Sequence, residues 1–191
     1  MRSLLLSTLL LLAGASATLA QESYSGDAAA SYQWVRTNAG PGDCGCFGTY
    51  GGGLSGTWNV RGPWSVVADI SAQHTGSGSP AGNSLTLVSY LAGARYRIPQ
   101  PWLKGKYKPR PFAQILLGPA HAGGGEAGVA DGTTRFAARI GGGVDVPLTS
   151  HFSVRVAQID YYLTTFANAT NDHQNNLLVS AGFVYRWSRE K

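Results

Sequence analysis

The segment from Arg135 to Leu163 alternates between apolar and polar residues along almost its whole length. In residues 135–146 every even position is apolar or glycine, and every charge lies on an odd position. Strict period-two alternation is typical of a β-strand with one apolar and one polar face. Residues 152–163 repeat the pattern. The residues from Pro147 to His151 predict a short turn between the two runs, because proline cannot continue the ladder. The sequence therefore predicts a β-hairpin with one charged face and one apolar face.

The rest of the chain contains further runs of the same kind. Eight strands are predicted, over residues 27–36, 50–60, 64–73, 85–98, 112–122, 135–146, 152–163 and 177–187. In the seventh run the polar phase slips by one residue near Ala157 and Gln158, which predicts a β-bulge. Short joints at 61–63 and 147–151 are interspersed with long, polar or glycine-rich joints. Short and long joints alternate along the chain, except that the joint at 99–111 is long where a short one is expected.

The length and the ends of these strands indicate a membrane barrel. Runs of about 9–11 residues match a tilted transmembrane strand. An even strand count with long loops at one rim and short turns at the other is typical of outer-membrane barrels. Aromatic residues lie near the short-turn ends (Trp58, Trp64, Tyr96, Tyr185 and Trp187) and near the long-loop ends (Tyr32, Trp34, Tyr161 and Tyr162). Two such girdles fit a membrane with two interfaces. The predicted fold class is all-β, an eight-stranded antiparallel up-and-down transmembrane β-barrel over residues 28–187.

Alternation alone does not say which face of the barrel points inward. A secreted soluble barrel of the lipocalin type would bury the apolar face, and it is the alternative. Charged residues make up only 13% of the chain, and 26 of the 191 residues are glycine. Many small residues in the apolar set suit a lipid-facing surface, and small polar residues on the other face suit a narrow lumen. These features favour the membrane orientation.

Residues 1–20 have the features of a secretory signal peptide. Arg2 precedes an apolar run over residues 4–12, and small residues end at Ala20. The run is too short to cross a membrane as a helix. Cleavage after Ala17 is the competing position, and an uncleaved anchor is less favoured. Residues 21–27 would then form a short lead-in and residues 188–191 a C-terminal tail.

Four stretches carry a resemblance to a known family. They are GGGVDVPLTSHFSVRVAQIDYYLTTF, SYLAGARYRI, PRPFAQILLGPAHA and the closing LLVSAGFVYRW. Over residues 24–187 the chain resembles the small OmpA/OmpX-like outer-membrane β-barrel domain proteins of Gram-negative-type bacteria. The resemblance implies an eight-stranded barrel in the bacterial outer membrane with both termini in the periplasm. Such proteins usually end on Phe or Trp, whereas here Ser-Arg-Glu-Lys follows Trp187. No peptidoglycan-binding domain follows either, so a cell-wall tether is not expected.

A catalytic interpretation depends on the spacing of His151 and Ser153. This His-x-Ser spacing resembles lipid A deacylases, in which an acidic residue orients the histidine. Nucleophile, base and orienting acid must lie within hydrogen-bond reach. Glu22, Glu126 and Glu190 do not match by local spacing, and the predicted periplasmic turn lies away from the leaflet that holds lipid A. We therefore expect no catalytic residues, with a lipid A deacylase-like enzyme as the alternative.

Other residues of chemical interest predict no defined site. His74, His121 and His173 map to the predicted long-loop rim and are expected to be solvated, so no metal or cofactor is predicted. The GGGVD and AGGGEAG stretches are not phosphate loops, because no helix with a lysine follows. Cys44 and Cys46 are too close in sequence for an unstrained disulfide, which leaves free cysteines, a strained bridge or a metal ligand pair open. The basic stretch 104–110 predicts a solvated turn, or a contact with acidic partners or lipid headgroups.

The polar face of the predicted barrel carries most of the charges. They are Asp69, Arg95, Arg139, Asp145, Arg155, Asp160 and Arg186. Eight strands enclose an interior only just wide enough for side chains to fill, and charges buried there must be paired. The sequence therefore predicts an interlocked Arg–Asp network that fills the lumen, with Asp145 close to Arg139 or Arg155. A small pore is the alternative, because Gly141 and Gly143 would leave local free volume.

These observations lead to one functional prediction. We expect a non-enzymatic integral outer-membrane barrel that contributes to envelope integrity or to surface interaction through its long loops. The expected partners are outer-membrane lipid and lipopolysaccharide, and the barrel-assembly machinery during insertion. No nucleic-acid partner is expected, and the predicted state is a monomer.

Overall fold

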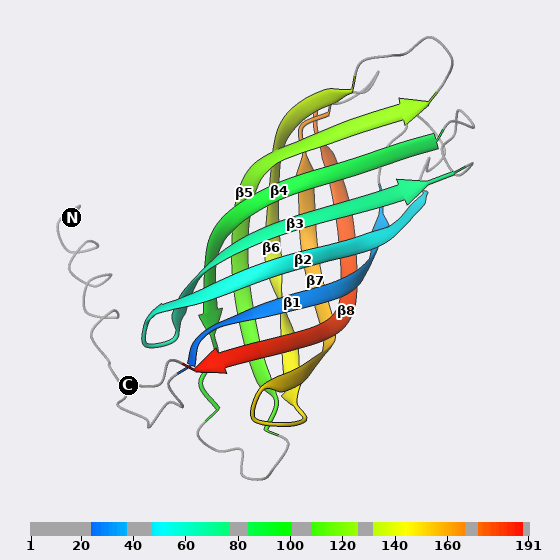
Figure 1. Ribbon diagram of the computed structural model, residues 1–191. Helices are drawn as coiled ribbons and strands as arrows, with labels where there is room; N and C mark the ends of the chain where they lie inside the picture. Colours follow the sequence, from blue (N-terminus) through cyan, green and yellow to red (C-terminus); the bar gives the residue numbers. More distant parts are fainter. Residues whose placement is uncertain are drawn as a thin grey trace, which may run out of the picture.

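The computed structural model describes residues 24–37, 47–76, 84–100, 108–125, 132–166 and 172–188. These residues form eight antiparallel strands that close into one barrel, in which each strand pairs with its neighbours in the chain and β1 pairs with β8 (Figure 1). The strands are β1 (Tyr24–Arg36), β2 (Gly48–Arg61), β3 (Trp64–Thr75), β4 (Ser84–Arg97), β5 (Arg110–Gly125), β6 (Thr133–Pro147), β7 (Phe152–Thr164) and β8 (Gln174–Ser188). The predicted fold class is confirmed. No helix among the described residues is long and apolar enough to cross a membrane.

Most strands extend further than the alternation predicted. Residues 24–27, expected in the lead-in, belong to β1, and Ser188, expected in the tail, ends β8. Arg110 begins β5, and Pro147 is the last residue of β6, where it pairs with Ser153. The alternation of apolar residues fades toward the loops, but backbone pairing does not require apolar side chains. The sequence pattern therefore underestimated the strand lengths.

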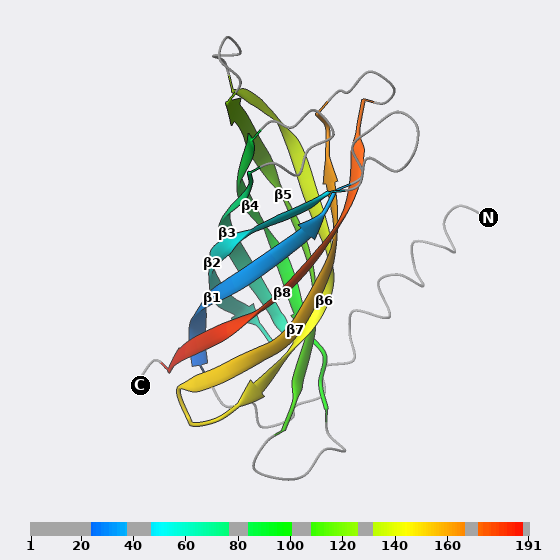
Figure 2. The same cartoon turned by 90° about the vertical axis from the view of Figure 1, so that its right-hand side faces the viewer.

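The two short hairpins lie at one end of the barrel. The β2–β3 and β6–β7 turns are found there together with the start of β1 and the end of β8 (Figures 1 and 2). In the β2–β3 turn Gly62 has a φ of 56°, a left-handed conformation that glycine adopts without a steric cost. The predicted alternation of short turns and long joints is therefore present, with the long β4–β5 joint as its exception.

The bulge predicted near Ala157 is confirmed. Val144 pairs with Ala157 but Asp145 pairs with Arg155, and on the other side Arg155 pairs with Gly182 while Gln158 pairs with Ser180. One extra residue in β7 therefore separates two phases of alternation. Both phases direct their polar residues into the lumen.

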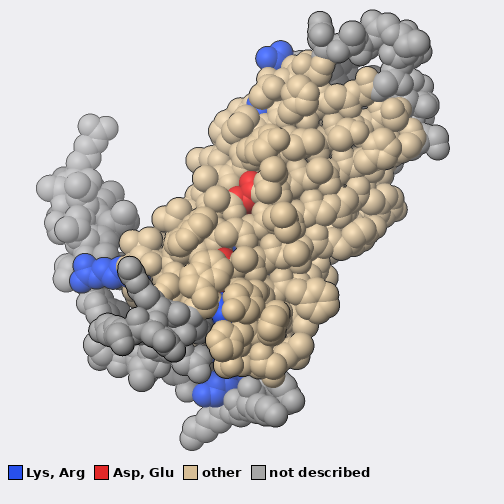
Figure 3. All heavy atoms as spheres, in the orientation of Figure 1, with Lys and Arg blue, Asp and Glu red and all other residues tan. Residues whose placement is uncertain are grey.

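The outer wall is almost free of charge on the face drawn in Figure 3. Its large exposed side chains include Leu54, Ile70, Ile115, Ile140, Ile159 and Phe183, and Phe183 is 69% exposed. The apolar set therefore points outward and the polar set inward, as in a membrane barrel and unlike a soluble one. Tyr162 departs from the prediction: it was expected in the girdle at the long-loop ends but is 0% exposed and lies in the lumen.

One place in the wall has a weakened hydrogen-bond ladder. The β4–β5 register runs from Ser89 opposite Ala120 to Ala92 opposite Leu117, without ladder pairs for the two β4 residues between them. Pro119, which has no N–H to donate, lies in the facing segment of β5. A recess of about 570 Å³ lies over this region, and its floor includes the small residues Gly56, Ala68 and Ala92.

Candidate functional site

The polar side chains of the barrel gather in its lumen. All seven charged residues predicted there occupy inward positions, and every one except half-buried Asp69 is buried. An eight-stranded barrel leaves room for side chains and little else. Several inward positions of β1 and β2 are small, among them Ser31, Gly53 and Ser55. The lumen is therefore the place where the chemistry of the described residues is concentrated.

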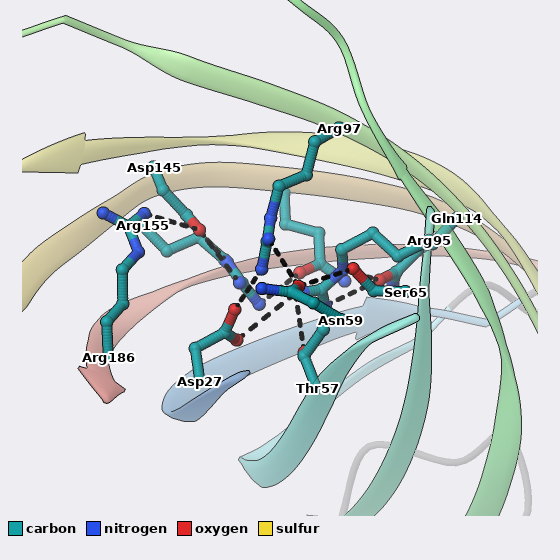
Figure 4. A network of polar contacts seen from close by, with 11 residues as sticks. Asp27, Thr57, Asn59, Ser65, Arg95, Arg97, Gln114, Asp145, Arg155 and Arg186 are labelled. Atoms are coloured by element: carbon teal, nitrogen blue, oxygen red, sulfur yellow. Dashed lines mark hydrogen bonds and ion pairs between the residues drawn. The ribbon is translucent and has the colours of Figure 1, made fainter. Parts of the chain in front are cut away.

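One cluster joins the last three strands near the short-turn end (Figure 4). Arg155 Nε donates to Asp145 Oδ1 at 2.8 Å and its Nη2 to Asp145 Oδ2 at 3.3 Å. Arg186 Nη2 lies 3.7 Å from the same Oδ2. Of the two partners that the sequence left open for Asp145, the structure places Arg155 against it. Arg155 Nη1 also donates to Gln158 Oε1 at 3.0 Å.

A second cluster at the same end contains two residues that the predicted network omitted (Figure 4). Arg97 Nη2 donates to Asp27 Oδ2 at 2.7 Å, and its Nη1 donates to Asn59 Oδ1 at 2.6 Å. Arg95 Nη1 lies 3.7 Å from Asp27 Oδ1, and Arg95 also donates to Gln114 Oε1 at 2.9 Å. Asp27 is the first residue of the first predicted strand but was left out of the predicted lumen network. Arg97 could have been included in the predicted network from the sequence, because it is two residues from Arg95 and therefore lies on the same face of the strand.

The ring of Phe112 connects the two clusters. The guanidinium carbons of Arg95 and Arg155 lie 4.3 Å and 4.6 Å from its centroid, a distance at which cations interact favourably with an aromatic ring. Gly143 provides the space for this ring, since a Cβ there would lie 2.9 Å from Phe112 Cζ. A Cβ at Gly141 would lie 2.4 Å from Asp160 Oδ1. The volume expected to stay free at these two glycines is therefore occupied.

A third cluster crosses the middle of the lumen around Arg139. Its Nη1 donates to Asp69 Oδ1 at 3.0 Å. Its Nη2 donates to the hydroxyls of Ser71 at 2.5 Å and Ser89 at 2.9 Å. The guanidinium carbon lies 4.6 Å from the centroid of the Tyr162 ring. A buried arginine is thus held by one carboxylate, two hydroxyls and an aromatic face.

Asp160 does not follow the expected Arg–Asp pairing. Gln158 Nε2 donates to its Oδ2 at 2.5 Å, and its Oδ1 is buried without a hydrogen-bond partner among the described residues. Within that part of the chain no arginine lies at ion-pair distance from Asp160. Arg139 Nε and Tyr162 Oη are also buried without a partner there. Asp160 is therefore connected to the network through an amide rather than through an ion pair.

The sequence predicted that an Arg–Asp network fills the lumen, but charged residues alone do not fill it. A cluster of buried apolar residues occupies it from mid-height toward the long-loop end: Val35, Val67, Leu87, Leu91, Leu116, Ala120, Ala137, Tyr162 and Leu178. These positions share the inward face with the charged residues. A polar layer and an apolar layer together occupy the lumen.

The other candidate residues do not form a site with one another. The exposed ring of His151 has Nδ1 2.9 Å from Ser150 Oγ, whereas Ser153 Oγ is buried and has no partner among the described residues. The His-x-Ser pair is therefore split between the turn and the lumen. Cys44 and Cys46 lie outside the described residues, as does most of the basic stretch 104–110.

The lipid-facing wall and the closed polar lumen define an integral outer-membrane β-barrel. Residues 6–186 match the family model of the outer membrane protein beta-barrel domain, and the chain belongs to this family. It is a protein of the bacterial outer membrane. A search of curated proteins finds no match to the chain.

Solved structures share the fold at low sequence identity. Neisserial surface protein A is 14% identical with a TM-score of 0.69, covering 86% of this chain and 99% of that one. Ail, the attachment invasion locus protein of Yersinia pestis, is 15% identical with a TM-score of 0.51, covering 85% and 99%. The N-terminal barrel domain of Pseudomonas aeruginosa OprF has the same four values as Ail. At these identities the similarity shows the fold alone.

Proposed function

We propose that this protein is a non-enzymatic, closed barrel that strengthens the outer membrane and presents its long loops at the cell surface. The observation that carries this proposal is the lumen, which three polar clusters and an apolar layer occupy among the described residues. Each arginine of these clusters bonds to residues on other strands. The barrel is thus built as a rigid support rather than as a conduit.

The proposal is tested by conductance and by envelope integrity. Purified full-length protein in planar lipid bilayers is expected to give no stable conductance, and a deletion strain is expected to become more sensitive to detergent and bile salts. Complementation by the wild-type gene provides the control. Steady, ion-selective openings would show a small pore and would contradict the closed barrel.

A surface-binding role for the loops is the finer part of the proposal. Ail, which has the same fold, has been crystallised with the heparin analogue sucrose octasulfate. A polyanion of this class is therefore a suitable first probe for cells that display the present protein. Binding of labelled sucrose octasulfate that disappears in the deletion strain would support a surface-interaction role, and equal binding by both strains would contradict it.

The enzymatic alternative is tested on lipid A itself. Lipid A masses from the wild-type, deletion and His151→Ala strains are expected to be identical, because His151 and Ser153 do not contact each other in the structure. A mass change shared by the deletion and the point variant would establish a lipid-modifying enzyme. We also propose that the protein is a monomer that contacts lipopolysaccharide and requires the barrel-assembly machinery for insertion.

A further inference from the structure

Two matched histidine–threonine pairs lie on the outer face of the barrel near its long-loop end. His74 Nδ1 on β3 lies 3.0 Å from Thr86 Oγ1 on β4. His121 Nδ1 on β5 lies 3.0 Å from Thr134 Oγ1 on β6. All four residues are exposed. The sequence predicted solvated histidines at the long-loop rim, and the structure places both on strands with their side chains directed outward.

The strand register makes these pairs part of one band. Tyr50 on β2 is opposite His74, which is in turn opposite Thr86. His121 is opposite Val88, two residues beyond Thr86 on the same face of β4, and diagonal neighbours of this kind are within reach of long side chains. Arg36 extends the band onto β1, since it is exposed and lies two residues beyond Trp34, the partner of Tyr50. We call this band the outer collar: Arg36, Tyr50, His74, Thr86, His121 and Thr134.

The outer collar lies at the upper edge of the apolar wall, at the end of the barrel with the long loops. Just below it the outward positions are apolar, with Ala72, Val88 and Phe136 next in register. Imidazole and guanidinium groups cannot face hydrocarbon without a large cost, so the collar lies at the level of the lipid headgroups. It is at the end of the barrel with the long loops, which in outer-membrane barrels is the extracellular end. The headgroups at that level belong to the outer leaflet, which contains lipopolysaccharide.

The chemistry of the outer collar favours an anion. The Thr hydroxyls lie at hydrogen-bond distance from Nδ1 of both histidines. When the hydroxyl donates to Nδ1, Nε2 carries the ring N–H. This N–H can donate outward from His74, whereas Nε2 of His121 lies beside Gly132, where a Cβ would be 2.3 Å away. Arg36 presents five N–H donors and no acceptor. Within the described part of the chain no carboxylate lies on the collar strands β1–β6 at this height, and the exposed acid at this end, Asp172, precedes β8. A row of donors and one fixed positive charge matches phosphate oxygens, which arginine binds well.

We propose that the outer collar binds the phosphate groups of lipopolysaccharide in the outer leaflet. The donors are the Arg36 guanidinium and Nε2 of His74, with His121 beside them, and the two threonines hold the imidazole rings in place. Tyr50 packs beside them at the interface, where amphipathic rings are favoured. The inference rests on the proposed contact with lipopolysaccharide. Because the site is on the outside of the wall, it does not depend on whether the lumen conducts.

The experiment compares matched variants of the purified full-length protein in detergent micelles. The collar variant is Arg36→Leu/His74→Leu/His121→Leu. The control variant, Arg61→Leu/His151→Leu, removes an exposed arginine and an exposed histidine at the opposite end. Both must show heat-modifiable gel migration, which reports a folded barrel. Native mass spectrometry then measures binding of bisphosphorylated lipid A, dephosphorylated lipid A and phosphatidylglycerol.

The collar variant is expected to bind bisphosphorylated lipid A about tenfold more weakly than the wild type, since it loses hydrogen bonds to a charged group. The control variant is expected to keep the wild-type affinity, and dephosphorylated lipid A is expected to bind both variants equally. Unchanged binding of bisphosphorylated lipid A by the collar variant would overturn the proposal. So would an equal loss for dephosphorylated lipid A, which would show recognition of sugars or acyl chains. Equal affinity for phosphatidylglycerol would show a general phosphate site instead.

Discussion

Arg139 on β6 donates a hydrogen bond to Asp69 on β3 at 3.0 Å, although the two residues are 70 positions apart in the chain. The strands that carry them are not neighbours in the sheet. The bond therefore crosses the lumen instead of following the wall. Because Arg139 is buried and Asp69 is mostly buried, the loss of either one leaves the other without compensation.

Replacing Asp69 by alanine is expected to lower the free energy of unfolding by about 3–5 kcal/mol, because Arg139 then stays buried without its carboxylate. Urea titration in liposomes, followed by heat-modifiable migration, measures the change. Asp172→Ala removes an exposed carboxylate and is expected to have an effect within about 0.5 kcal/mol. The double variant Asp69→Ala/Arg139→Leu should recover part of the loss. Simple additivity of the two single variants would show that the pair is not coupled.

Asp145 and Asp160 are expected to respond differently to the same substitution. Asp145→Asn weakens the contacts with Arg155 and Arg186 and should destabilise the barrel by about 3 kcal/mol. Asp160 accepts a bond from Gln158 without an arginine at ion-pair distance in the described chain. Asp160→Asn should therefore change stability by less than about 1 kcal/mol. The same urea titration compares the two, and equal losses would contradict the difference drawn from the geometry.

The inward glycines are expected to tolerate no side chain. A Cβ at Gly141 would lie 2.1 Å from the carbonyl oxygen of Ile159, so Gly141→Ala must displace backbone. The nearest atom to a Cβ at outward-facing Gly52 is 3.4 Å away. Overpacking of this kind costs about 1–3 kcal/mol, whereas Gly52→Ala should be close to neutral. Thermal unfolding of the two variants in one detergent tests this, and equal midpoints would refute it.

The bulge in β7 predicts one tolerated deletion. Removing Ala157 restores plain alternation and leaves Arg155 and Gln158 facing the lumen, so the barrel should still assemble. Removing Ile70 from β3, which pairs with β4 without a register shift, must turn either Asp69 or Ser71 and Gln73 toward lipid. The fraction of heat-modifiable protein in isolated outer membranes should stay near wild type in the first variant and collapse in the second. Failure of both would mean that the bulge itself is required.

The sequence predicts the wall of this barrel better than its lumen. Alternation sets which face each residue takes, and it located the β7 bulge from the phase of Arg155 and Asp160 alone. Arg155 and Asp145 could be placed together because they flank one short hairpin. The ends of the strands were harder to predict, because they are rich in glycine, threonine and asparagine, which show no apolar alternation.

Bonds across the lumen could not be derived in the same way. The pairs Arg139–Asp69 and Arg97–Asp27 depend on how far neighbouring strands are offset and on how the sheet curves, which no local pattern records. The inward leucines Leu116 and Leu178 were hidden for a related reason. They lie between outward aliphatic neighbours, where the sequence is apolar at consecutive positions and the period of two is lost.

The cross-lumen bonds also have a consequence for the order of assembly. Asp27 on β1 meets Arg97 on β4, and Arg139 on β6 meets Asp69 on β3. Neither bond joins neighbouring strands, so neither can form while the sheet is still open and only slightly curved. An open intermediate keeps these polar groups hydrated and loses that water only as β1 approaches β8. The final closure of the barrel and the drying of its interior are thus one cooperative event.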